Sequence, residues 1–188
     1  ATMDVTFTNS WYDPTLEQAG AIKLINNAAK LISLHADSTG APTESQNNGI
    51  PFVFYNGSAK DACPDTYIVA SYINWAPYLE YAMNCVINGE EIAADWVGTL
   101  ENGGVALKEL NEAVAAEGTA EKLEEVKAML LDGSLKVFDT ATFTVGGETL
   151  TSYLADVDDM GDFVGETEVI ADGYFHESEF RSAPVFDL

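Results

Sequence analysis

Basic side chains are scarce in this chain, which has eight Lys and Arg residues against 31 Asp and Glu residues among 188. The formal net charge at pH 7 is therefore −23. Proteins that bind nucleic acid neutralise its phosphates with clusters of Lys and Arg, so the composition excludes nucleic acid as a partner. An anionic membrane surface would repel the chain for the same reason. We interpret the acidic excess as a source of solubility.

Cysteine and histidine are also rare, with two residues of each. The sequence has no Cys-x-x-Cys pair and no His-rich spacing, so we expect no metal site and no cofactor. The two cysteines leave two alternatives open. Cys63 and Cys85 form one disulfide in an exported chain, or they are a loop thiol and a buried helix thiol.

The motifs of common enzyme sites are missing as well. No Gly-x-Ser-x-Gly elbow accompanies the histidines, and Gly103-Gly104 lacks the Lys and Ser/Thr of a phosphate loop. Cys63 has no histidine near it in the sequence that would activate a thiol nucleophile. Acidic residues are plentiful, but nothing selects a catalytic pair among them. We therefore expect no catalytic residue.

The sequence as given shows no signal-peptide pattern and no apolar run near twenty residues. It starts and stops within strand-like patterns, so we expect it to be a piece of a longer protein. Apolar residues make up 47% of the chain, which is typical of a globular protein. Its length is enough for one domain of moderate size with a sizeable core.

The first half of the chain alternates strand patterns with helix patterns. Such alternation predicts an α/β fold, in which a parallel sheet has helices on both faces. The expected strands are residues 3–9, 31–35, 51–55 and 67–71, and the expected helices are residues 14–29, 42–48 and 75–88.

The second half of the chain has more strand and turn patterns and fewer helix patterns. Strands are expected at 95–100 and 105–107, around Gly103-Gly104, and an amphipathic helix at 119–131. A two-residue Gly146-Gly147 turn predicts a hairpin between 142–145 and 148–150. The segment 157–188 has irregular apolar spacing, so we expect loops with short strands there.

Polar and aromatic residues follow several of the predicted strands. If these strands are parallel, their carboxyl ends lie at one edge of the sheet, where open α/β sheets bind ligands. A tryptophan supplies a face for stacking, and Asp or Asn supplies directed hydrogen bonds, which suits a flat polar ligand such as a nucleobase or nucleoside. The alternative is that these residues only end strands, cap helices and cover the edge. The candidate ligand-binding residues are Trp11, Asp37, Asn56, Asn74 and Trp75.

The same segments resemble the basic membrane protein family of substrate-binding lipoproteins, which serve ABC importers and include purine-nucleoside receptors. The resemblance covers residues 3 to about 137, in the right order and spacing. It is carried by Asn-Ser-Trp-Tyr-Asp-Pro at 9–14, His-Ala-Asp-Ser at 35–38, Phe-Tyr-Asn at 54–56, Cys-Pro-Asp at 63–65, Ile-Asn-Trp-Ala-Pro-Tyr at 73–78, and Trp-Val-Gly at 96–98 followed by Gly104-Val105.

The resemblance implies a periplasmic-binding-protein-like fold of type I, in which two α/β lobes clamp a ligand at a hinge. Residues 1–138 would be the second lobe, a three-layer parallel-sheet lobe, and the first lobe would be missing. The helix at 75–88 would then be a crossover helix that packs on the missing lobe. Without that lobe it would dock on its own lobe, pair with a second copy in a homodimer, or expose its apolar face. Residues 139–188 would be a β-rich C-terminal extension like that of some Gram-positive members.

The resemblance also implies roles for the candidate residues. Trp11 would stack on the base, and Asp37 and Trp75 would be edges of the pocket. Asn56 occupies a position where nucleoside-binding members have an aspartate for the ribose hydroxyls. Asn74 falls near a position where some members have a lysine. Both differences remove charge, so the ligand stays open between a purine nucleoside, a nucleobase and another flat metabolite.

The resemblance thus predicts an extracytoplasmic solute-binding protein, anchored to the membrane as a lipoprotein, that delivers its ligand to an ABC permease and is not an enzyme. The alternative is a small-molecule-handling enzyme on a doubly wound α/β fold, because a fold does not by itself determine a function.

Overall fold

The computed structural model describes residues 2–157 and 165–176 of the chain. They belong to two compact units, Ala1–Glu124 and Glu125–Leu188. The boundary between the units falls within helix α4 (Thr119–Leu131), which forms where the sequence predicts it. The lobe boundary expected at residue 138 stays a prediction.

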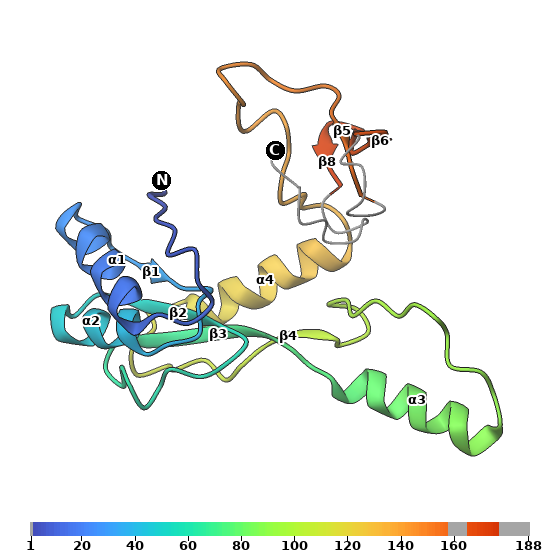
Figure 1. The fold of residues 1–188 in the computed structure, drawn as a ribbon, viewed down its shortest axis with the longest axis horizontal. Coiled ribbons are helices and arrows are strands. Elements are labelled where there is room, and N and C mark those ends of the chain that lie inside the picture. Colours follow the sequence, from blue (N-terminus) through green and yellow to red (C-terminus); the bar gives the residue numbers. More distant parts are fainter. Residues whose placement is uncertain (1, 158–164, 177–188) are drawn as a thin grey trace. The chain divides into compact units, whose positions relative to one another are not determined.

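The first unit is built on a four-stranded sheet (Figure 1). Its strands, in spatial order, are β1 (Ile32–Ser33), β2 (Phe52–Tyr55), β3 (Tyr67–Ile73) and β4 (Val105–Leu107). The first three pair in parallel, as their apolar patterns predict. The fourth pairs antiparallel with β3, so the sheet is mixed.

Two helices pack together beside the sheet (Figure 1). Helix α1 (Pro14–Asn26) starts at the predicted N-cap, since the Asp13 carboxylate accepts hydrogen bonds from the Thr15 and Leu16 N–H groups at 3.1 and 2.9 Å. Helix α2 (Gly40–Asn48) ends at Gly49, whose φ of 64° is left-handed. The core between the helices and the sheet contains Ala21, Ile32, Ala41, Phe52, Ala59, Cys63, Tyr67 and Ala70.

The strand expected at residues 3–9 does not form. In the described part of the chain β1 pairs only with β2, and residues 3–9 do not add to its open edge. Met3 and Phe7 are accordingly 85% and 82% exposed. The predicted strand was wrong because an alternating pattern shows that a segment can pair, not that a partner lies beside it.

The strand expected at residues 95–100 is also absent. Instead, the side chain of Asn102 organises a turn there. Its Oδ1 accepts hydrogen bonds from the Thr99 and Gly104 N–H groups, and its Nδ2 donates to the Val97 carbonyl. A side chain that bonds nearby backbone in this way competes with sheet pairing.

Helix α3 (Ala76–Asn88) projects from the end of β3 (Figure 1). One side of it packs along the segment that follows, where the rings of Tyr78 and Trp96 lie 5.4 Å apart and the Ala93 N–H donates to the Tyr81 hydroxyl at 2.9 Å. The other side is apolar and exposed. Its members are Leu79, Met83, Val86 and Ile87, which are 54–75% exposed.

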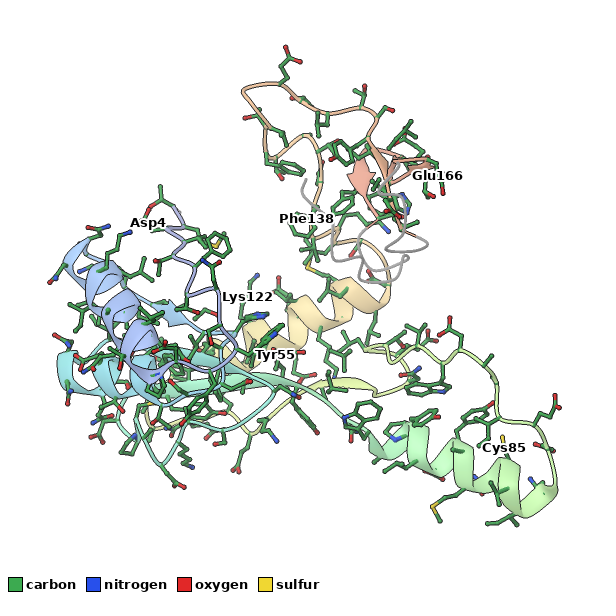
Figure 2. All side chains as sticks on the ribbon, viewed as in Figure 1. Asp4, Tyr55, Cys85, Lys122, Phe138 and Glu166 are labelled. Carbon is green, nitrogen blue, oxygen red and sulfur yellow. The ribbon has the colours of Figure 1, made fainter. Side chains whose placement is uncertain are left out.

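Both cysteines are free thiols, so the disulfide alternative is wrong for this structure. Cys63 lies in the loop before β3 and donates to the Ala59 carbonyl at 3.2 Å, and Cys85 is buried on α3 (Figure 2). Burial in the core raises the pKa of the Cys63 thiol, because the thiolate would lose its hydration. Cys63 therefore behaves as a small core residue rather than as a nucleophile.

The second unit contains short antiparallel strands. β5 (Leu154–Ala155) pairs with β6 (Thr167–Glu168), and β7 (Ile170–Ala171) pairs with β8 (Tyr174–Phe175). The predicted glycine turn forms as a single bridge between Val145 and Glu148, with positive φ at Gly146 and Gly147. Of the segment expected to be loops with short strands, 165–176 fits that description, while 158–164 and 177–188 lie outside the described residues.

Within the described ranges, no helix is long and apolar enough to cross a bilayer. The same part of the chain holds no cluster of three or more side chains suited to binding a metal ion.

The exposed side of α3 makes a testable prediction for the isolated 188-residue chain. We expect amides of α3 to exchange with deuterium faster than those of α1, because α1 is packed in the core and α3 has one apolar side in water. The two helices are matched controls, since each has 13 residues and a proline in its first turn. Protection that rises with protein concentration would show that a second copy covers α3. Equal protection of α3 and α1 at low protein concentration would contradict the exposure of the apolar side of α3.

Candidate functional site

The carboxyl ends of β1, β2 and β3 lie at one edge of the sheet because these strands are parallel. The loop before α1 joins this edge. The Asp37 N–H, after β1, donates to the Trp11 carbonyl at 2.8 Å. Both side chains stay exposed, and the Trp11 indole is 76% exposed. The structure thus brings together two of the predicted site residues, with their side chains available to a ligand.

Next along this edge, the rings of His35 and Tyr55 stack (Figure 2 labels Tyr55). Their centroids are 4.7 Å apart and their planes differ by 4°. The sequence named these residues as strand ends but not as site residues. The stack depends on the register of the sheet, which the sequence does not give: Ser33 pairs with Val53, and two residues further on the same offset sets His35 opposite Tyr55. The two stacked rings lie between the ends of β1 and β2.

Asn56 follows β2 in the left-handed region, with φ of 57°. Its Oδ1 accepts a hydrogen bond from the Ile73 N–H at 3.2 Å, and its own N–H donates to the Ser71 carbonyl at 2.6 Å. The amide oxygen therefore holds the end of β2 against the end of β3. Asn56 thus has the structural role that the sequence left open as the alternative, that of a residue that ends a strand.

Asn74 serves the backbone in a similar way. Its Nδ2 donates to the Gly103 carbonyl at 3.0 Å, and its Oδ1 accepts from the Ala76 N–H at the start of α3. Trp75 is exposed and makes an edge-to-face contact with Tyr78, with ring centroids 6.3 Å apart. Asn74 thus ties the end of β3 to the turn before β4, while Trp75 presents its ring beside that junction.

One residue that sequence reasoning missed is Glu17, a buried carboxylate in the first turn of α1. Its two oxygens accept hydrogen bonds from backbone N–H groups of Asp13 and Ser38. The available signal was its spacing from the Asp13 N-cap, since an acidic residue shortly after an N-cap often bonds back to the cap's N–H. The bond to Ser38 could not be read from the sequence.

Taken in strand order, the edge carries Trp11 with Asp37, then the His35–Tyr55 stack, then Asn56, and then Asn74 with Trp75. The exposed Trp11 indole can stack on a planar molecule, and the Asp37 carboxylate can accept hydrogen bonds from its rim. No pair of these groups is arranged as a nucleophile and its base. The arrangement can bind a ligand.

Two solved structures, both of solute-binding proteins, share the fold of this chain. An ABC transporter solute-binding protein from Conexibacter woesei aligns with a TM-score of 0.62 at 20% identity, over 73% of this chain and 46% of that one. A solute-binding protein from Aeropyrum pernix aligns with a TM-score of 0.55 at 17% identity, over 71% and 46%.

The family follows from the sequence itself. The model of the Bmp family, the PnrA-like ABC transporter substrate-binding proteins, matches residues 1–136, so the chain belongs to this family. This confirms the resemblance seen in the sequence. A purine-binding protein of Brucella abortus is 29% identical over 138 residues, which are 71% of this chain and 38% of that protein. The chain thus spans less than half the length of these relatives.

The left-handed backbone at Asn56 makes a stability prediction. An Asn56→Ala variant should lose about 1–2 kcal/mol of unfolding free energy, because alanine strains this conformation and cannot accept the Ile73 N–H bond. Asn56→Gly, which relieves the strain but not the lost bond, should lose less. Urea unfolding followed by tryptophan fluorescence reports on the first unit, which contains all three tryptophans. An alanine variant as stable as the parent would contradict the assignment.

Proposed function

We propose that this chain is the second ligand-binding lobe of a solute-binding protein that delivers a purine-like molecule to an ABC permease. Trp11 carries the proposal, because a large aromatic side chain is held 76% exposed on a loop that is hydrogen-bonded into the strand-end edge. An indole in that position gains contact area only when something covers it. A flat ligand stacked on Trp11 and hydrogen-bonded to Asp37 fits these groups.

The state of the two asparagines favours a nucleobase over a nucleoside as the ligand. Asn56 is neutral, and its amide oxygen already accepts from the backbone of β3. Asn74 uses both its amide nitrogen and its oxygen on backbone groups. Neither side chain supplies a free carboxylate for the hydroxyls of a ribose. The name of the Brucella relative, a purine-binding protein, is consistent with this choice.

The exposed side of α3 supports the two-lobe part of the proposal. Burying a large apolar side chain is worth about 1.5–3 kcal/mol, so the row from Leu79 to Ile87 is a strong candidate for burial against another surface. In this proposal, the other lobe of the full-length protein covers the row, and the ligand is clamped by a hinge closure between the lobes. A homodimer of the isolated chain would bury the same row.

The family consists of substrate-binding proteins rather than enzymes, and its members are extracytoplasmic. For this chain, we propose the same placement, with anchoring as a lipoprotein. No observation on the sheet edge favours the alternative of an enzyme.

The test is calorimetry on the full-length protein with adenine and adenosine as probes. Adenine should bind more tightly than adenosine. Trp11→Ala should weaken adenine binding by about 5–150-fold, the equivalent of a stacking energy of about 1–3 kcal/mol. Trp11→Phe, which keeps a flat ring, should lose less. The melting temperature should not change in either variant, because the indole is exposed.

Two results would contradict the proposal. If neither purine binds, the ligand class is wrong. If adenine binds the Trp11→Ala variant as tightly as the parent, the binding site lies elsewhere. The isolated 188-residue chain should bind adenine poorly, because it offers only one side of the clamp.

A further inference from the structure

Glu17 is a charged side chain at a place where charge is costly. It is 2% exposed and is among the largest fully buried side chains of the described residues. Burying a carboxylate is strongly unfavourable unless hydrogen bonds replace its hydration. Each oxygen of the Glu17 carboxylate accepts a hydrogen bond, and these two bonds offset the cost of burial. The groups that donate them indicate the role of the residue.

The two oxygens bond to two different loops. Oε1 accepts the N–H of Asp13 at 3.0 Å, two residues after Trp11. Oε2 accepts the N–H of Ser38 at 3.2 Å, immediately after Asp37. Glu17 therefore bridges the loop that carries Trp11 and the loop that carries Asp37.

Other contacts show how closely the two loops approach. The Asp37 N–H donates to the Trp11 carbonyl, and the buried Ser38 hydroxyl accepts from the Gly40 N–H at 3.1 Å. A side chain on Gly40 would collide with the carbonyl oxygen of Pro14, so glycine permits this approach. The backbones of the two loops thus pack against each other, and the Glu17 carboxylate lies where they meet.

We infer that Glu17 is a positioning residue, which holds the Trp11 and Asp37 loops at the separation that ligand binding requires. The inference rests on the proposed function, but its structural half does not depend on the ligand. Only a carboxylate fits this role, because it accepts hydrogen bonds on both oxygens. In glutamine one of those oxygens becomes an NH₂ group, which would face a backbone N–H donor.

The experiment compares Glu17→Gln with Glu44→Gln in the full-length protein. Glu44 is a matched control, because it lies on α2 and its carboxylate accepts a hydrogen bond from Gln18 of α1 rather than from either loop. Two quantities are measured for the folded protein: the dissociation constant for adenine, and deuterium uptake over residues 10–13 and 36–39. Affinity per folded molecule separates positioning from a loss of stability.

Glu17→Gln should weaken adenine binding about tenfold or more, since hydrogen bonds to a charged group are the stronger kind. It should also raise deuterium uptake in both loops, whereas Glu44→Gln should change neither quantity. If Glu17→Gln does not fold, Glu17→Asp keeps the charge but is too short to reach both donors, and the same losses are expected.

Unchanged uptake in both loops would overturn the inference, whatever happens to the affinity. Raised uptake with parental affinity for adenine would overturn it too, because the loops would then be free without loss of binding. If the parent protein binds no purine, the proposed function fails, and the uptake alone decides whether Glu17 holds the loops.

Discussion

Parallel pairing of β1, β2 and β3 is the constraint on which the first unit depends. Parallel strands must be joined by crossovers, so each one delivers its following loop to the same edge of the sheet. Hydrogen bonds then join those loops in sequence: Asp37 to Trp11, and Asn56 to the end of β3. The edge is therefore a surface built from chain segments that lie far apart in the sequence.

Most elements of the first unit could be predicted, because helical and strand periodicities are local properties. Whether a strand finds a partner is not local. Residues 3–9 alternate like a strand yet stay outside the sheet, and Val105–Leu107 pairs antiparallel although its short apolar run carries no sign of direction. Residues 95–100 were misassigned because the hydrogen bonds of one side chain, Asn102, override a weak strand pattern.

The candidate site, too, could be predicted from the sequence only in part. Asp37 follows β1 at the edge that the sequence predicts. Trp11 follows no strand, because residues 3–9 stay outside the sheet, and its loop is held at the edge by the hydrogen bond from the Asp37 N–H. An asparagine at a strand end is ambiguous, because the same amide can serve a ligand or the backbone, and Asn74 bonds backbone with both ends of its amide. The Glu17 bridge to Ser38 spans α1 and the loop after β1, so only the packed structure reveals it.

The proposed function depends on a planar ligand that stacks on Trp11 at the edge formed by the three parallel strands. A crystal structure of the full-length protein with adenine would show whether this contact exists. We expect the purine ring to stack on the Trp11 indole, with a ring nitrogen or amino group hydrogen-bonded near Asp37. Adenine bound away from this edge, with the Trp11 indole still in solvent, would contradict it.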